Sequence, residues 1–130
     1  MEEVLAFLDA CGTYYLATND NGQPRVRPFG TALIHEGKLL IQTGKSKPCS
    51  KQMHEDPRVE ICAFLNGKWL RLTAKAEELD SVAARKAMLD KYPHLRGMYD
   101  ENDGNCEVFA LRDCTAAFTS FTEAPHTVSF

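Results

Sequence analysis

The sequence contains no hydrophobic run that approaches the roughly 20 residues needed for a transmembrane helix. Its N-terminus, MEEVLAFLDAC, is acidic, whereas a secretory signal peptide begins with basic residues. Lys and Arg total 15 against 18 Asp and Glu, so the formal net charge is −3 and the basic excess typical of nucleic-acid-binding proteins is missing. We therefore expect a cytoplasmic protein whose partners include neither membrane nor nucleic acid.

The sequence also lacks any CxxC pair, and its cysteines are odd in number. They are Cys11, Cys49, Cys62, Cys106 and Cys114. This pattern is typical of reduced thiols and not of a disulfide framework or a zinc site, and the four histidines show no metal-ligand spacing. We expect Cys62, in an apolar strand, to be buried, and Cys49, beside a helix start, to be the most reactive thiol.

Hydrophobic periodicity and turn signals predict three helices and about six short strands in a single domain of residues 1–130. The predicted helices cover 2–11, 47–55 and 81–92, and the predicted strands cover 13–18, 25–34, 39–42, 58–65, 68–79 and 106–121. Hairpin turns such as Asn66-Gly67 make nearly all the strands antiparallel, and the turn at 35–38 is expected to pair the strand of Arg27 with the strand that begins at Leu39. Closing the sheet would remove its exposed edges, so the pattern favours a mainly β (α+β) fold with a small six-stranded antiparallel barrel and flanking helices.

The segment 39–58, LLIQTGKSKPCSKQMHEDPR, combines a buried strand, a tight turn and a helix start. Ser46 is the predicted N-cap of that helix. Three lysines, Lys45, Lys47 and Lys51, surround a helix end whose free N–H groups and dipole already favour an anion. A bound phosphate and a solvated basic turn without a ligand fit these residues about equally well.

Several pieces, taken in order, resemble the pyridoxamine 5'-phosphate oxidase-like family. The pieces are PRVRPF, LLIQTG, a lysine-bearing helix ending in DPRVEI, and an Asn-Gly hairpin that leads into WLRLTAKAEEL. The resemblance covers about residues 5 to 120 in the order of elements and is most specific from 23 to 79. Members of this family are FMN-binding split β-barrels, usually homodimers with flavin at the interface. The resemblance therefore implies a split barrel, FMN as the cofactor and a homodimer.

The resemblance also implies flavin-binding residues. Arg27 matches the strand arginine that reaches the FMN phosphate, although from the residues alone an ordinary ion pair is favoured. Pro28 and Phe29 follow it along the strand that faces the isoalloxazine ring. Gln42 and Thr43 match the strand end beside the ring and the ribityl chain.

One departure from the family pattern lies in the predicted helix. The arginine-lysine pair of the biosynthetic members falls on Pro48 and Cys49, so neighbouring residues are expected to supply the lost charge. In the next hairpin a tryptophan sits where the family approaches the flavin, although by itself a packing or interface role is favoured, and a dimer allows both. These further cofactor-binding candidates are Lys47, Ser50, Lys51 and Trp69.

The flavin carries the redox chemistry itself, so the sequence predicts no catalytic residue and no particular substrate. The expected function is an FMN-dependent oxidoreductase acting on a small molecule, and no Gly-rich dinucleotide fingerprint favours FAD. The chain lacks the C-terminal segment with which pyridoxamine oxidases hold substrate phosphate, so true pyridoxamine 5'-phosphate oxidase activity is not expected. The small flavin reductases, including nitroimidazole-resistance-type proteins, are more similar. The alternative is a non-catalytic flavin- or haem-binding dimeric barrel.

Overall fold

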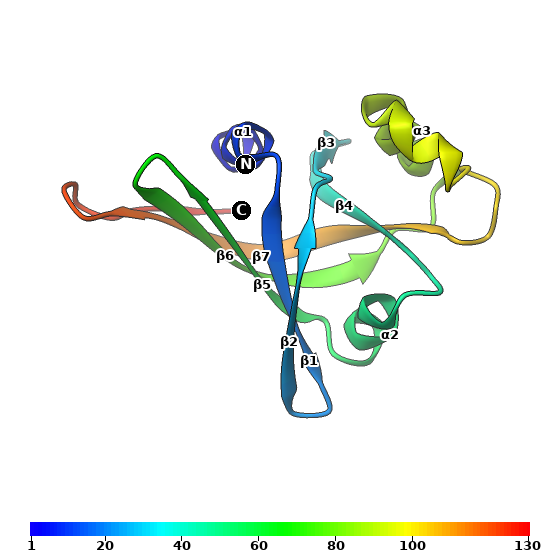
Figure 1. Ribbon diagram of the computed structural model, residues 1–130, viewed down its shortest axis with the longest axis horizontal. Helices are drawn as coiled ribbons and strands as arrows, with labels where there is room; N and C mark the ends of the chain where they lie inside the picture. Colours follow the sequence, from blue (N-terminus) through cyan, green and yellow to red (C-terminus); the bar gives the residue numbers. More distant parts are fainter.

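The computed structural model describes all residues from Met1 to Phe130. An eight-stranded antiparallel sheet with three α-helices makes up the fold (Figure 1). The strands are β1 (Tyr14–Asp20), β2 (Gln23–Phe29), β3 (Leu33–His35), β4 (Lys38–Gly44), β5 (Arg58–Leu65), β6 (Lys68–Glu78), β7 (Cys106–Ser120) and β8 (His126–Ser129). The helices are α1 (Glu2–Cys11), α2 (Pro48–Glu55), α3 (Val82–Lys91) and the short 3-10 helix η1 (Pro93–Gly97).

The strand order is β2-β1-β5-β6-β7-β4-β3, with β8 paired to β7 outside this path. Because β2 and β3 end the path without pairing to each other, the sheet curves but does not close, as in a split barrel. The predicted mainly β, antiparallel split-barrel class is confirmed. The sheet has eight strands instead of about six. The additional ones are β8 and the separate β3.

Local sequence signals account for several boundaries. Gly12 ends α1 with a φ of 74°, a left-handed conformation that suits glycine. The Ser81 hydroxyl accepts a hydrogen bond from the Ala84 amide and caps α3. Asn66 and Gly67 both have positive φ, as a tight hairpin between β5 and β6 requires.

The predicted strand 25–34 is wrong in its extent, because the chain leaves β2 at Phe29 and re-enters the sheet only at Leu33. β2 pairs with β1, where Arg27 lies opposite Leu16, and β3 pairs with β4. The expectation that the strand of Arg27 would pair with the strand of residues 39–43 is therefore also wrong. The intervening residues carry the chain from one edge of the sheet to the other.

Two further expectations are corrected. Lys47, and not Ser46, is the N-cap of α2, and no side chain caps that helix. The Ser46 amide donates instead to the Asn105 side chain, which holds the turn to the start of β7. Cys62 is exposed, because the alternation of β5 turns its neighbours Ile61 and Ala63 inward.

The main core lies between the inner face of the sheet and helices α1 and α2. It includes Leu16, Ile41, Ile61 and Leu72, all 0% exposed. A second core cluster joins α3 to the opposite face of β4 and β7. Helices α2 and α3 consequently lie on opposite sides of β7 toward the same end of the molecule (Figure 1). None of the helices combines the length and hydrophobicity needed to cross a bilayer.

Candidate functional site

One pocket of about 200 Å³ collects residues from the end of β2, the end of β4 and the start of α2. Five of the sequence-predicted cofactor residues line it, namely Pro28, Phe29, Gln42, Thr43 and Lys47. Residues 28–29 and 42–43 lie on strands that do not pair with each other. The fold thus brings together two predicted segments through the path of the chain between β2 and β3.

Another wall of the pocket comes from the end of α3, from η1 and from the residues that follow η1. No sequence motif connected these residues with a binding site. This wall consists of Tyr92, His94, Leu95, Met98 and Tyr99. A methyl group at Gly44 would lie 2.9 Å from the Tyr99 hydroxyl, so the tyrosine packs closely against this glycine and would have to shift for any larger residue. Gly44, at the end of β4, is the sequence signal that could have indicated a close approach by another segment, here the segment of Tyr99.

Main-chain hydrogen bonds hold the polar floor of the pocket. The Thr31 hydroxyl accepts from the Gln42 amide at 3.0 Å, and the Gln42 side chain donates to the Thr43 carbonyl at 2.9 Å. The Thr43 hydroxyl lies 3.3 Å from the Cys49 sulfur, which is only 4% exposed. The high reactivity expected of Cys49 stays a prediction, and its burial opposes it.

Two tyrosines hold the segment between β2 and β3 in place. The Tyr14 hydroxyl donates to the Thr31 carbonyl at 2.6 Å, and the Tyr92 hydroxyl bonds both the amide and the carbonyl of Ala32 at 3.0 Å. Burial, reinforced by the nearby Tyr92, raises the pKa of Tyr14 well above its usual range. Tyr14 therefore remains a neutral hydrogen-bond donor at physiological pH.

Arg27 lies outside the lining of this pocket. Its guanidinium donates to the Thr18 hydroxyl and to the Gln52 side-chain oxygen, each at 2.7 Å, and to the Leu16 carbonyl at 3.3 Å. All three acceptors are neutral. The half-buried positive charge of Arg27 therefore has no carboxylate partner beside α2, which contradicts the ordinary ion-pair interpretation.

The lysines around the start of α2 differ in their partners. Lys45 lies 3.4 Å from Glu78, and the exposed Lys51 lies 3.9 Å from a glutamate one turn along the helix. Lys47 forms no ion pair and faces the pocket. α2 has no side-chain cap, but Pro48 has no N–H and the Ser50 amide donates to the Lys47 carbonyl at 3.1 Å, so this helix end offers an anion its dipole and the Cys49 amide. Lys47 and the uncapped helix end are thus the anion-attracting features at this pocket.

Two of the predicted cofactor-binding residues, Ser50 and Trp69, do not line the pocket. Ser50 is buried and donates its hydroxyl hydrogen to Glu107, so that hydrogen is not free for a phosphate. Trp69 lies near the tip of the β5–β6 hairpin, where its ring packs 5.2 Å from that of Phe121. Within one chain, Trp69 does not line the pocket.

The outer face of β1, β2 and β5 carries large apolar side chains that nothing in the chain covers. Tyr15 is 52% exposed, Val26 67% and Phe64 64%. Tyr15 pairs across the sheet with Pro28 on one side and with Cys62 on the other. An exposed apolar surface that continues over neighbouring strands is typical of a protein interface. We call these residues, Tyr15, Val26, Pro28, Cys62 and Phe64, the outer apolar face.

Comparison with known proteins identifies relatives over nearly the whole chain. A family model described as pyridoxamine 5'-phosphate oxidase matches residues 1–111. A crystal structure of a NimC/NimA family protein from Clostridium acetobutylicum is 38% identical and superposes with a TM-score of 0.97, covering 100% of this chain and 92% of that chain.

More distant structures share the fold alone. General Stress Protein 26 from Bacillus anthracis str. Sterne is 13% identical with a TM-score of 0.79, covering 99% of this chain and 97% of that one. A heme binding protein from Mycobacterium smegmatis is 19% identical with a TM-score of 0.75, and the match covers 95% of this chain but only 55% of that protein. No curated protein matches the sequence.

Proposed function

The chain belongs to the pyridoxamine 5'-phosphate oxidase family, and on that premise we propose that it binds FMN and acts as an oxidoreductase on a small molecule. The observation that carries this proposal is the pocket that collects Pro28, Phe29, Gln42, Thr43 and Lys47. It combines an aromatic side chain for the flavin ring, polar groups for the ribityl chain and an unpaired ammonium group for the phosphate.

The proposed phosphate site is the start of α2. Lys47 supplies a cation without a carboxylate partner, and the uncapped helix end supplies the Cys49 amide and a favourable dipole. Lys51 can join them, because its exposed ion pair within the helix is weak. Arg27 adds an uncompensated positive charge from the other side of α2 and keeps that helix against β1.

The flavin, when bound, supplies the redox chemistry, and the residues of this chain bind and orient it. Gln42 and Thr43 are buried and held by main-chain bonds, so they present fixed polar groups toward the pocket. Phe29 and Tyr92 provide apolar walls that exclude water from a planar ring. No side chain of the pocket is assigned as an acid or a base.

We propose that the functional unit is a homodimer with the flavin at the interface. The pocket of about 200 Å³ is smaller than the ~300–1,000 Å³ of typical cofactor sites, so one chain supplies only part of the wall. The outer apolar face includes Pro28, which also lines the pocket, so this face continues to the pocket edge. A partner seated on this face would complete the pocket, and the Trp69 hairpin could then reach the flavin of the other subunit.

A second candidate is non-catalytic haem binding. The fold similarity to a heme binding protein raises this possibility, and His94 at the pocket wall offers an imidazole of the kind that ligates haem iron. The two functions differ in colour, because a flavoprotein is yellow and a haem protein has an intense Soret band. An absorption spectrum of the purified protein therefore separates them.

The deciding experiment combines identification of the cofactor with turnover. Mass spectrometry of the released cofactor should give FMN, and anaerobic reduction by a nicotinamide donor should be followed by reoxidation with a small-molecule acceptor. Lys47→Ala should weaken FMN binding, whereas Lys38→Ala, which removes an exposed lysine at the start of β4, should not. FAD, or no flavin after reconstitution, would overturn the proposal.

A further inference from the structure

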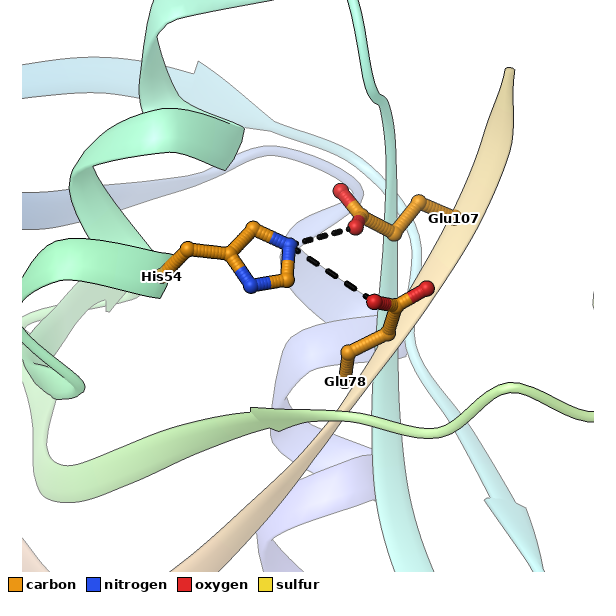
Figure 2. A group of neighbouring side chains, drawn as sticks. All are labelled: His54, Glu78 and Glu107. Carbon is orange, nitrogen blue, oxygen red and sulfur yellow. Dashed lines mark hydrogen bonds and ion pairs between the residues drawn. The ribbon is translucent and has the colours of Figure 1, made fainter. Parts of the chain in front are cut away.

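Three potential metal ligands converge beneath α2, away from the pocket. The His54 ring projects from α2 toward two glutamates on neighbouring strands, Glu78 at the end of β6 and Glu107 on β7 (Figure 2). Its Nε2 atom lies 2.7 Å from Glu107 and 3.7 Å from Glu78. One donor atom from each of the three residues lies within 4.8 Å of the other two. Three elements thus direct one nitrogen and two carboxylates at a common point.

Glu107 is the residue that makes this cluster more than a set of surface charges. Its side chain is 0% exposed, and a buried carboxylate is costly unless its charge is compensated. The Ser50 hydroxyl donates to one carboxylate oxygen, which leaves the other directed at His54. A hydrogen bond of this kind fixes the orientation of a metal-ligating carboxylate in the same way that second-shell groups do.

The charges around the cluster are unequal. Two carboxylates face one imidazole, and the other cation nearby is Lys45, 3.4 Å from Glu78. Lys45 is about half exposed and sits on a flexible side chain, so it can turn to solvent without unfolding any element. With Lys45 turned away, two carboxylates and one imidazole remain at a half-buried position. A divalent cation would bring all three donors into contact with a positive charge.

We propose that His54, Glu78 and Glu107 form a binding site for a divalent transition-metal cation, with Zn²⁺ as the representative ion. Imidazole with carboxylate suits Zn²⁺ and related ions, whereas Mg²⁺ and Ca²⁺ prefer oxygen ligands alone. With metal–ligand distances of about 2.0–2.1 Å, tetrahedral donors lie about 3.3 Å apart. The separations of 2.7 and 3.7 Å from His54 bracket this value.

The position of the site defines what the metal would do. His54 is 45% exposed, so a fourth position on its solvent side is open to water. The ion would join the last turn of α2 to β6 and β7, one helix length from the Lys47 end that is proposed to bind phosphate. The site uses none of the residues that line the pocket, so it does not depend on the flavin proposal.

The test measures zinc binding by titration calorimetry and compares two neighbouring glutamates. All proteins carry Cys62→Ser, so that the exposed thiol cannot bind zinc. The parent should bind one Zn²⁺ per chain. Glu78→Gln, which leaves the His54–Glu107 pair intact, should weaken binding by at least about tenfold. The matched control Glu77→Gln removes an exposed carboxylate one residue away and should bind zinc like the parent.

A second measurement checks the ligands directly. Co²⁺ in place of Zn²⁺ should give the visible absorption of a low-symmetry nitrogen–oxygen site in the parent and in Glu77→Gln, and this absorption should be lost in Glu78→Gln. Equal zinc affinity in Glu78→Gln and the parent would overturn the proposal. Absence of binding at zinc concentrations well above that of the protein would also overturn it, and the cluster would then be a metal-free ion-pair network.

Discussion

The Arg27 guanidinium on β2 donates to the Gln52 side-chain oxygen on α2 at 2.7 Å, linking two elements that are distant in the sequence. The same oxygen accepts a hydrogen bond from the Thr18 hydroxyl at 2.6 Å. Since Gln52 is neutral and buried, it positions the guanidinium without cancelling its charge. This arrangement leaves a fixed positive charge beside the middle of α2, the helix whose start is the proposed phosphate site.

The first prediction concerns this charge. Arg27→Ala should weaken FMN binding by about 1 kcal/mol, the order of a charge–charge attraction that acts without a direct hydrogen bond, and should change riboflavin affinity much less. Fluorescence titration with both ligands measures the difference. Arg25→Ala is the matched control, because it removes an exposed arginine from the same strand. Equal losses for FMN and riboflavin would show that Arg27 acts only on the fold.

The second prediction concerns the contact between β4 and the segment after η1. Gly44→Ala should destabilise the protein by about 1–3 kcal/mol, because the new methyl group would lie 2.9 Å from the Tyr99 hydroxyl and 3.1 Å from its ring. Chemical denaturation measures the free energy of unfolding. Adding Tyr99→Phe should restore part of the loss by removing the hydroxyl.

The control for this prediction is Gly97→Ala in η1, where an added methyl group meets no atom within 4 Å. It should leave the free energy of unfolding nearly unchanged. If Gly44→Ala is no more destabilising than Gly97→Ala, Tyr99 does not pack against the strand end as described.

The third prediction concerns alkaline pH. Burial, reinforced by the nearby Asp113, raises the pKa of the Cys114 thiol to about 11. An unfolded thiol ionises near pH 8.5, so the unfolded state loses its proton first. The contribution of the Cys114 thiol to the free energy of unfolding is therefore fully present below about pH 8.5. It decreases as the pH rises toward 11, because the unfolded thiol ionises while the folded one stays protonated.

Denaturation curves at several pH values test this. Cys114→Ala should show a smaller loss of stability between pH 8.5 and 11 than the parent, because one buried thiol no longer titrates. Thr115→Ala changes an exposed, non-titrating neighbour on the same strand and should keep the parental slope. Identical slopes in Cys114→Ala and the parent would contradict the buried position of this thiol.

The fourth prediction concerns the outer apolar face. The parent should sediment at about twice 14.5 kDa. Phe64→Asp should give a monomer, because it places a charge on the proposed interface, and it should also lose FMN because the pocket is then incomplete. Val82→Asp, on α3 and outside this face, is the control. A monomeric parent that binds FMN stoichiometrically would contradict the interface site.

Much of the secondary structure followed from local signals. Gly12, the Asn66-Gly67 turn and the Ser81 cap act over only a few residues, so they identify element ends without knowledge of the fold. The break after Phe29 has no such signal, because it arises where the chain exchanges one strand partner for another. β8 was missed for the same reason, since it exists only through its pairing with β7.

In the candidate site, too, local sequence determined some features and tertiary contacts determined others. The sequence by itself determined the chemistry of the segment from Gln42 to Lys51, because residue types, the turn and the helix start are local properties. Only the tertiary structure decided which of these groups are available: Lys47 is unpaired, whereas Ser50 donates to a glutamate on β7. It also decided that Tyr99 closes the pocket, because contacts between distant segments depend on the order of strands in the sheet, which no short stretch of sequence encodes.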